Sequence, residues 1–158
     1  MAYTHILVAV APLEEGAVLL GRAQALAQKL GARLSVLHVV ELALPMNTLG
    51  AGGGLSAGGD DIGMINQVEI TDSLLQSARQ RVEALCEKFG IEAADVYVRV
   101  GGHAAEIITG AAEIAADLIV VGHQPHHGWS ALFSHTEESV VHRARCDVLA
   151  IALDGATA

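Results

Sequence analysis

Histidines cluster near the C-terminal end of the chain. The pattern His-x-x-His-His at His123, His126 and His127 is followed by His135 and His142. Imidazole nitrogens are common metal ligands, so this spacing could bring two of them to one zinc or nickel ion. No carboxylate or cysteine stands beside them at a recognisable metal-ligand spacing. We therefore interpret the pattern as a polar, partly exposed turn without metal ligands, with a weak ion site as the alternative.

Candidate nucleophiles lie among these histidines. Ser130, Ser134 and Ser139 are close to them in sequence, but no Gly-x-Ser-x-Gly elbow surrounds any of the three. The chain also lacks a Walker A string, a dinucleotide-binding Gly-x-Gly-x-x-Gly after the first apolar run, and a zinc-protease His-Glu-x-x-His. We therefore predict that the protein is not an enzyme and has no catalytic residues.

Other polar residues stand beside predicted elements. His38 falls inside an apolar run and is expected to be a hydrogen-bonded core histidine. His103 precedes a predicted helix, where it could cap the helix or lie on the surface, or alternatively help to hold an anion. Glu137 and Glu138 are expected in the first turn of the last helix, where they favour the helix dipole and would repel a nearby phosphate.

Alternating apolar segments position these residues. Five short apolar runs predict strands, and between them apolar residues recur at helical spacing. The first two helices end at Gly31 and Gly90, since glycine is the usual residue just past a helix end. The predicted strands are 5–10, 33–40, 95–100, 118–121 and 148–153, and the later helices are 104–116 and 136–143.

This order predicts an α/β fold. Strands that alternate with helices form a doubly wound parallel sheet with helices on both faces, here five strands in the order 3-2-1-4-5. Ligands bind where the strand order reverses, between the first and fourth strands. We expect one domain over residues 1–158, interrupted by a flexible glycine-rich insertion at about 45–65.

Composition narrows the class of partner. The net charge of −9 argues against nucleic acid and anionic membrane surfaces, both of which require clustered cations. No apolar run is long enough to span a bilayer, and the first residues lack the pattern of a signal peptide, so a cytoplasmic location is expected. Cys86 and Cys146 are isolated, which is typical of reduced thiols.

Several segments together carry a family resemblance. The strings MAYTHILVAV, GARLSVLHVV and DLIVVGHQ…WSALFS…CDVLAI resemble the universal stress protein family over nearly the whole chain. The opening and the Trp129-Ser130-x-Leu132-x-Ser134 spacing are most similar to its UspA-type branch. The resemblance implies a Rossmann-like fold of the adenine-nucleotide alpha-hydrolase kind.

The resemblance also implies a choice between two ligand types. One branch binds ATP through a Gly-x2-Gly-x9-Gly-[Ser/Thr] loop and an Asp after the first strand, whereas the UspA type lacks this loop. Here Ala11 replaces the Asp, and Pro125, which has no N–H to donate, stands at the second glycine. Ser134-His135 aligns with the last pair after a one-residue shortening, so the chain departs from the ATP pattern three times.

The degenerate nucleotide crevice is still the candidate site. A shifted loop would keep a flexible turn at Gly128 and a hydroxyl at Thr136, so ATP or AMP binding remains the alternative. The candidate residues are Ala11, Val39, Gly122, Pro125, Gly128, Ser134, His135 and Thr136.

The resemblance finally implies an assembly and a role. Family members commonly dimerise through the last strand, and an apolar edge strand invites such pairing, so we expect a homodimer through residues 148–153. The expected function is that of a cytoplasmic, non-enzymatic UspA-type stress-response protein without a cofactor, acting through an unknown regulatory partner. A slow ATP hydrolase or adenylate-transfer enzyme is the third reading.

Overall fold

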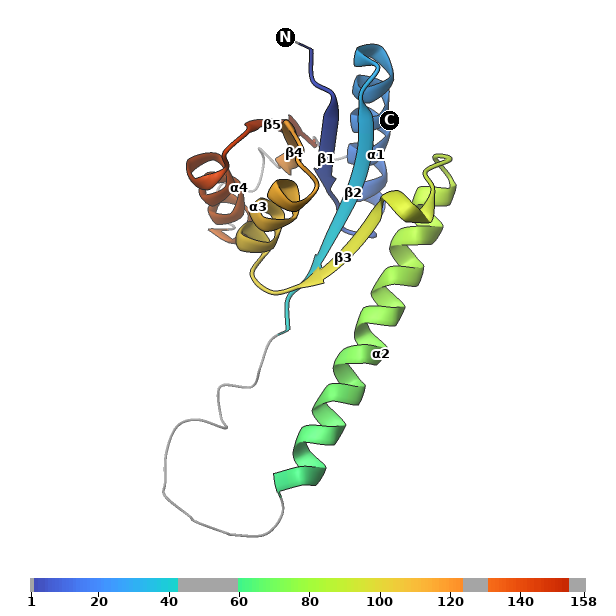
Figure 1. Cartoon of the computed structure of the whole chain (residues 1–158), viewed down its shortest axis with the longest axis vertical. Coiled ribbons are helices and arrows are strands. Elements are labelled where there is room, and N and C mark those ends of the chain that lie inside the picture. Colours follow the sequence, from blue (N-terminus) through green and yellow to red (C-terminus); the bar gives the residue numbers. More distant parts are fainter. Residues whose placement is uncertain (1, 43–59, 124–130, 154–158) are drawn as a thin grey trace.

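The sheet at the centre of the molecule has five strands. The computed structural model describes residues 2–42, 60–123 and 131–153, and of these the side chains of 60–67 and 131–135 are not described. The strands are parallel and lie in the order β3-β2-β1-β4-β5 (Figure 1). Their bounds are β1 His5–Ala9, β2 Arg33–Val40, β3 Val96–Val100, β4 Leu118–His123 and β5 Asp147–Ala152. The predicted α/β fold and strand order are confirmed.

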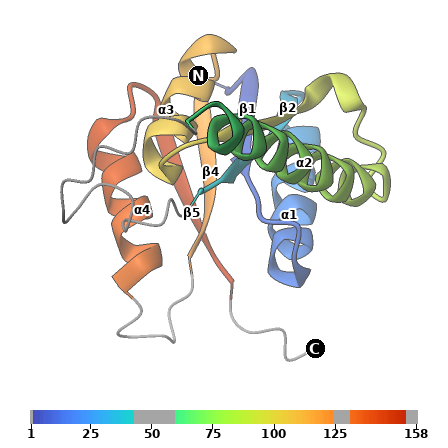
Figure 2. The same ribbon diagram turned by 90° about the horizontal axis from the view of Figure 1, so that it is seen from below.

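Helices cover both faces of the sheet. Helices α1 and α2 lie on one face and α3 and α4 on the other, as Figure 2 shows. A short 3-10 turn, η2, leads into β3. The bounds are α1 Glu14–Leu30, α2 Asp60–Glu87, η2 Ala93–Asp95, α3 His103–Glu113 and α4 Ala131–Arg143.

Alternation along β1 supplies two cores. Ile6 and Val8 belong to the cluster that contains side chains of α1 and α2, whereas Leu7 belongs to the cluster with α3 and α4. All three are buried, as is usual for a central parallel strand covered on both sides. The strands are continuous apolar runs because both of their faces are covered.

A left-handed glycine follows each of two helices. Gly31 has φ 65° and donates its N–H to the carbonyls of the last turn of α1. Gly90 has φ 68° just past α2. Residues with side chains rarely adopt this left-handed conformation. Gly31 therefore ends α1 where the sequence predicted, whereas α2 already ends at Glu87, three residues before Gly90.

Several predicted boundaries are wrong, among them the end of the third helix, which was predicted at 116 and lies at Glu113. Helix α4 begins at Ala131 instead of Thr136, because Ala131, Leu132 and Phe133 continue the helix and need no cap at the threonine hydroxyl. Strand β4 continues through Gly122 to His123, because both residues pair with β5. The predicted insertion ends earlier than expected, since α2 already begins at Asp60, and its remaining part at about 45–59 lies outside the described residues.

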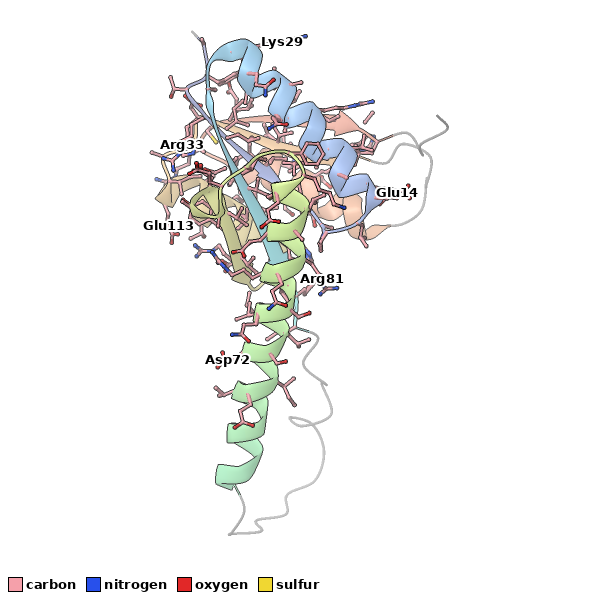
Figure 3. All side chains as sticks on the ribbon, turned by 90° about the vertical axis from the view of Figure 1, so that its right-hand side faces the viewer. Glu14, Lys29, Arg33, Asp72, Arg81 and Glu113 are labelled. Carbon is pink, nitrogen blue, oxygen red and sulfur yellow. The ribbon has the colours of Figure 1, made fainter. Side chains whose placement is uncertain are left out.

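Helix α2 is much longer than the sheet needs. Its 28 residues span about 42 Å at 1.5 Å per residue. Ala78 and Val82, in its C-terminal half, are buried against the sheet, whereas Val68 is 61% exposed. Figure 3 shows Asp72 on the part of α2 that extends beyond the sheet. Neither α2 nor another helix in the described ranges is both long and apolar enough to cross a membrane.

Candidate functional site

A cavity opens at the carboxyl ends of β1, β2 and β4. Its volume is about 210 Å³. The strand order reverses here, because β2 and β4 lie on opposite sides of β1, and open parallel sheets bind ligands at such points. Most of its wall is apolar, from side chains that include Val10, Leu19, Leu37, Ile107, Val121 and Leu153.

The cavity brings together half of the predicted site residues. Ala11, Val39, Gly122 and Thr136 all line it. Pro125 and Gly128 lie outside the described residues. The remaining two belong to α4, with side chains that are not described: Ser134 and His135.

Gly16 fixes the first wall of the cavity. In the segment after β1, the N–H of Leu13 donates to the carbonyl of Ala11 at 2.8 Å, and the N–H of Ala17 donates to the carbonyl of Leu13 at 3.1 Å. This compact turn brings the start of α1 directly against Ala11, with no room for a Cβ at Gly16. Sequence reasoning missed Gly16, although a glycine in the first turn of a predicted helix is itself a signal of close packing.

Gly122 shapes the opposite wall. A Cβ at Gly122 would lie 2.6 Å from Cδ1 of Leu153. The N–H of Leu153 donates to the carbonyl of His123 at 2.6 Å, which holds the end of β5 against β4. In the described chain, Gly122 therefore lets Leu153 close the cavity, and it lies in a paired strand instead of the predicted turn.

His38 lies on the cavity wall. A hydrogen bond determines which of its ring nitrogens carries the hydrogen. Its Nδ1 is 2.9 Å from the carbonyl oxygen of Val10, which can only accept, so Nδ1 carries the hydrogen and Nε2 the lone pair. Burial lowers the pKa of the His38 imidazole below its ordinary value. The predicted hydrogen bond of His38 is confirmed, but the residue is half-buried on the cavity wall instead of in the core.

His103 is the first residue of α3 and also lines the cavity. Its Nδ1 lies 3.2 Å from Oε2 of Glu41. The imidazole therefore contacts a carboxylate of its own chain, which argues for a structural role over the alternative of holding an anion.

Glu137 is the residue that most changes the chemistry of the cavity. Because α4 begins at Ala131, Glu137 lies in the second turn, and its predicted place in the first turn is wrong. Nδ1 of His123 donates to its Oε2 at 2.9 Å. Its Oε1 is buried and has no hydrogen-bond partner in the described part of the chain. Sequence reasoning missed both the pair and the orientation of this carboxylate.

The polar side chains of the wall are rich in acceptors. They are Glu15, His38, His103, Thr136 and Glu137, with neither lysine nor arginine among the described residues that line the cavity. Two carboxylates without a cation make a negative potential there, and carboxylates repel phosphate.

Two comparisons decide the family. The universal stress protein family model matches residues 2–152. The universal stress protein A homolog 2 of Coxiella burnetii is 32% identical over 154 residues, which are 97% of this chain and 97% of that protein. The chain belongs to the universal stress protein family.

Solved universal stress proteins share the fold. UspA from Lactobacillus plantarum is 23% identical, with a TM-score of 0.60, and the match covers 96% of this chain and 99% of that one. A universal stress protein in complex with cAMP is 21% identical, with a TM-score of 0.53, covering 96% and 98%. At these identities, the likeness shows the fold alone.

Among the described residues, the cavity departs from the ATP-binding pattern of universal stress proteins, while residues 124–130 of the loop after β4 lie outside them. Gly122 is retained, but the first-loop Asp is Ala11 and Glu137 presents a buried carboxylate. A triphosphate needs N–H donors and cations, and the described wall includes the first turns of α1 and α3 but no lysine or arginine, and it adds carboxylates.

The histidine-rich segment forms no metal centre among the described residues. His126 and His127 lie outside those residues, and the side chain of His135 is not described. His142 is exposed and lies 3.8 Å from Glu138. In this segment, the two histidines whose side chains are described, His123 and His142, therefore each lie near a glutamate instead of near each other.

A serine-histidine pair does occur, at the opposite end of the sheet. Nε2 of His5 lies 2.8 Å from the hydroxyl of Ser35, and Nδ1 donates to the carbonyl of Ile114 at 3.0 Å. Ser35 is 0% exposed, so its hydroxyl cannot reach a substrate. Asp117 does not touch the imidazole: it accepts from Thr4 and from the N–H of His5, and these bonds lower its pKa. This network is structural.

Proposed function

We propose that this universal stress protein acts as a non-enzymatic, dimeric UspA-type scaffold of the cytoplasm, without ATP as a resident ligand. Its effect on the cell would come through contacts with a regulatory partner. The family membership and the fold support the stress-response role. The absence of a resident nucleotide is the part of the proposal that the cavity supports.

The observation that carries this proposal is the carboxylate of Glu137. Its side chain is 17% exposed, and one of its oxygens is buried without a donor in the described chain. Glu15 adds a second negative charge to the same wall. A triphosphate here would place like charges together in a partly dehydrated site, where their repulsion is stronger than in water.

The non-enzymatic role rests on where the reactive side chains lie. Ser35 is fully buried behind His5, and the Nδ1 hydrogen of His38 is directed to a backbone carbonyl. Cys86 is buried, and burial raises the pKa of its thiol to about 11, so its reactive thiolate is scarce at neutral pH. None of these groups combines exposure with an activating base.

The dimer rests on β5. This strand is at the edge of the sheet, and Leu149, Ala150 and Ala152 are exposed on it. An exposed apolar edge strand pairs readily with another chain. Helix α4 contacts β5, and Val141 on this helix is 56% exposed.

Nucleotide binding is the competing candidate. It is favoured by the solved universal stress protein in complex with cAMP and by the presence of Gly122 and Thr136 on the cavity wall. A cyclic mononucleotide carries less charge than a triphosphate, so the carboxylate argument weighs less against it.

Two measurements separate these candidates. Protein purified from cells without added nucleotide is denatured, and the supernatant is analysed by mass spectrometry for ATP, AMP and cAMP. The purified protein is then titrated with Mg·ATP and with cAMP in a thermal-shift assay, since a ligand that binds the native state stabilises it by RT ln(1 + [L]/Kd). We expect no released nucleotide and no shift at millimolar concentrations, and stoichiometric nucleotide or a shift that grows with the logarithm of nucleotide concentration overturns the proposal.

A pair of variants tests the physical reason. Glu137→Gln removes the buried charge, whereas Glu138→Gln makes the same change one position along the helix, where the side chain is 67% exposed. If repulsion excludes phosphate, Mg·ATP should bind measurably better to Glu137→Gln than to Glu138→Gln. Equal, undetectable binding by both variants would contradict the repulsion argument.

A further inference from the structure

Two residues on the cavity wall, His38 and Glu137, carry hydrogen-bond acceptors. Nδ1 of His38 donates its hydrogen to the carbonyl of Val10, so Nε2 carries a lone pair. Glu137 receives a hydrogen from His123 on Oε2 only, which leaves Oε1 buried and without a donor among the described residues. Both side chains line the same cavity.

An unpaired buried carboxylate oxygen is costly. Leaving a buried acceptor unsatisfied destabilises the folded state, more so when the group is charged. The described wall contains no lysine or arginine that could neutralise it, and Glu15 adds a second carboxylate. A bound cation would offset the negative charge of the two carboxylates on this wall, whereas an anion would add to it.

The remainder of the wall selects an apolar body. Side chains of Val10, Leu37 and Ile107 line the cavity. The volume of about 210 Å³ is below the range of roughly 300–1,000 Å³ that is usual for larger ligands. A small molecule with one apolar portion and one cationic end fits both the size and the lining.

We propose that the cavity binds a small amphiphilic amine, with its ammonium group paired with the Glu137 carboxylate and its apolar portion against the side chains at the ends of β1, β2 and β4. This inference rests on the proposed exclusion of phosphate from the cavity. It adds a ligand class whose charge is opposite to that of phosphate. The cavity would then distinguish amines from anions by charge and hydrogen bonding as well as by shape.

A matched series of probes tests the proposal on the unaltered protein. Phenethylamine, phenethyl alcohol and hydrocinnamate share one apolar portion and differ in carrying an ammonium, a hydroxyl or a carboxylate. Each is titrated near neutral pH by thermal shift and by calorimetry. We expect phenethylamine to bind at least about tenfold more tightly than phenethyl alcohol, which follows from a charge-assisted hydrogen bond, and hydrocinnamate not to bind. Equal binding of all three, or no binding of phenethylamine, overturns the proposal.

The variants assign the charge to one residue. Glu137→Gln should reduce phenethylamine affinity to that of phenethyl alcohol, and Glu138→Gln should leave it unchanged. If Glu137→Gln keeps the full preference for the amine, the proposed contact is wrong. The unfolding midpoint of each variant without ligand establishes that it is folded, and the probe series needs no variant.

The outcomes also separate this inference from the proposed function. Binding of Mg·ATP by the parent protein overturns the proposed absence of a resident nucleotide. If the parent protein binds neither phenethylamine nor Mg·ATP, the amine-binding inference is wrong and the proposed function stands. Because Glu137→Gln should weaken the amine and favour ATP, the two ligands respond to one substitution in opposite directions.

Discussion

The Cα of Gly16 lies so close to Ala11 that a Cβ added to Gly16 would be 1.8 Å from the carbonyl oxygen of Ala11. This contact joins the first turn of α1 to the segment that follows β1. Both residues line the cavity, so the same close approach that packs the helix also shapes the candidate site.

Gly16→Ala should therefore destabilise the protein, although alanine has the higher helix propensity by about 1 kcal/mol. The helix would have to move away from the backbone of Ala11, and we expect a loss of at least about 2 kcal/mol in the free energy of unfolding. Urea denaturation measures this value. Gly102→Ala is the control, because nothing lies within 4 Å of its added Cβ and its φ is −71°. Equal, small effects in both variants would contradict the packing argument.

Ser35→Ala should remove a buried donor from His5. Nδ1 of His5 donates to the carbonyl of Ile114, so Nε2 must accept from the serine hydroxyl. The variant leaves this partly buried acceptor unpaired, which should cost about 1–3 kcal/mol of stability. Chemical denaturation compares it with Ser73→Ala, an exposed position on α2 that should change stability by less than about 0.5 kcal/mol. If Ser35→Ala and Ser73→Ala change the free energy of unfolding equally little, the hydrogen bond between Ser35 and His5 does not stabilise the fold.

The pKa of His38 predicts a pH dependence. Burial lowers the pKa in the folded state below the ordinary value of 6.5, so the unfolded chain takes up a proton first as the pH falls. Stability should therefore decrease as the pH falls through about 6.5 toward the lowered pKa, and should level off below it. Asn in place of His38 keeps an N–H near Nδ1 but does not titrate. The stability difference between parent and His38→Asn should change across this pH window, and parallel curves would refute the assignment.

The dimer should depend on the outer face of β5. Leu149→Lys places a charge on the exposed edge, where Leu149 is 38% exposed. Burying that charge in an interface is unfavourable, so the variant should become monomeric. Light scattering after size exclusion measures the mass. Val18→Lys is the matched control, since Val18 on α1 is 39% exposed. A monomeric parent, or a dimeric Leu149→Lys, would show that β5 is not the interface.

The fold was predictable because its signals are local. Apolar runs bounded by glycine mark strands, and apolar residues at helical spacing mark α1, α3 and the C-terminal half of α2. Gly31 then ends α1 by its backbone conformation alone. Such local signals also failed at two boundaries: Gly122 was expected to end β4, which continues to His123, and the start of α4 at Ala131 was missed although a serine, a residue type that favours helix caps, directly precedes it in the sequence.

The site was predictable in place but not in chemistry. Strand order located the crevice, and Ala11 and Thr136 do line it. Which side chains of α4 face the crevice depends on how the helix is rotated about its axis. The predicted start of α4 was five residues too late, so this rotation could not be predicted from the sequence. The orientation of Glu137, and its pairing with His123 from a different element, therefore needed three-dimensional information.

The strand order also bears on how the chain is made. Strands β1, β2 and β3 are neighbours in both sequence and space, so a growing polypeptide can join them early. Strand β4 must return across more than a hundred residues to reach β1, pairing Ile6 with Leu118. Until β4 has been synthesised and has paired with β1, the wall of the cavity that β4 and α4 supply is missing. A small molecule that binds the cavity would therefore stabilise only the fully synthesised, folded chain.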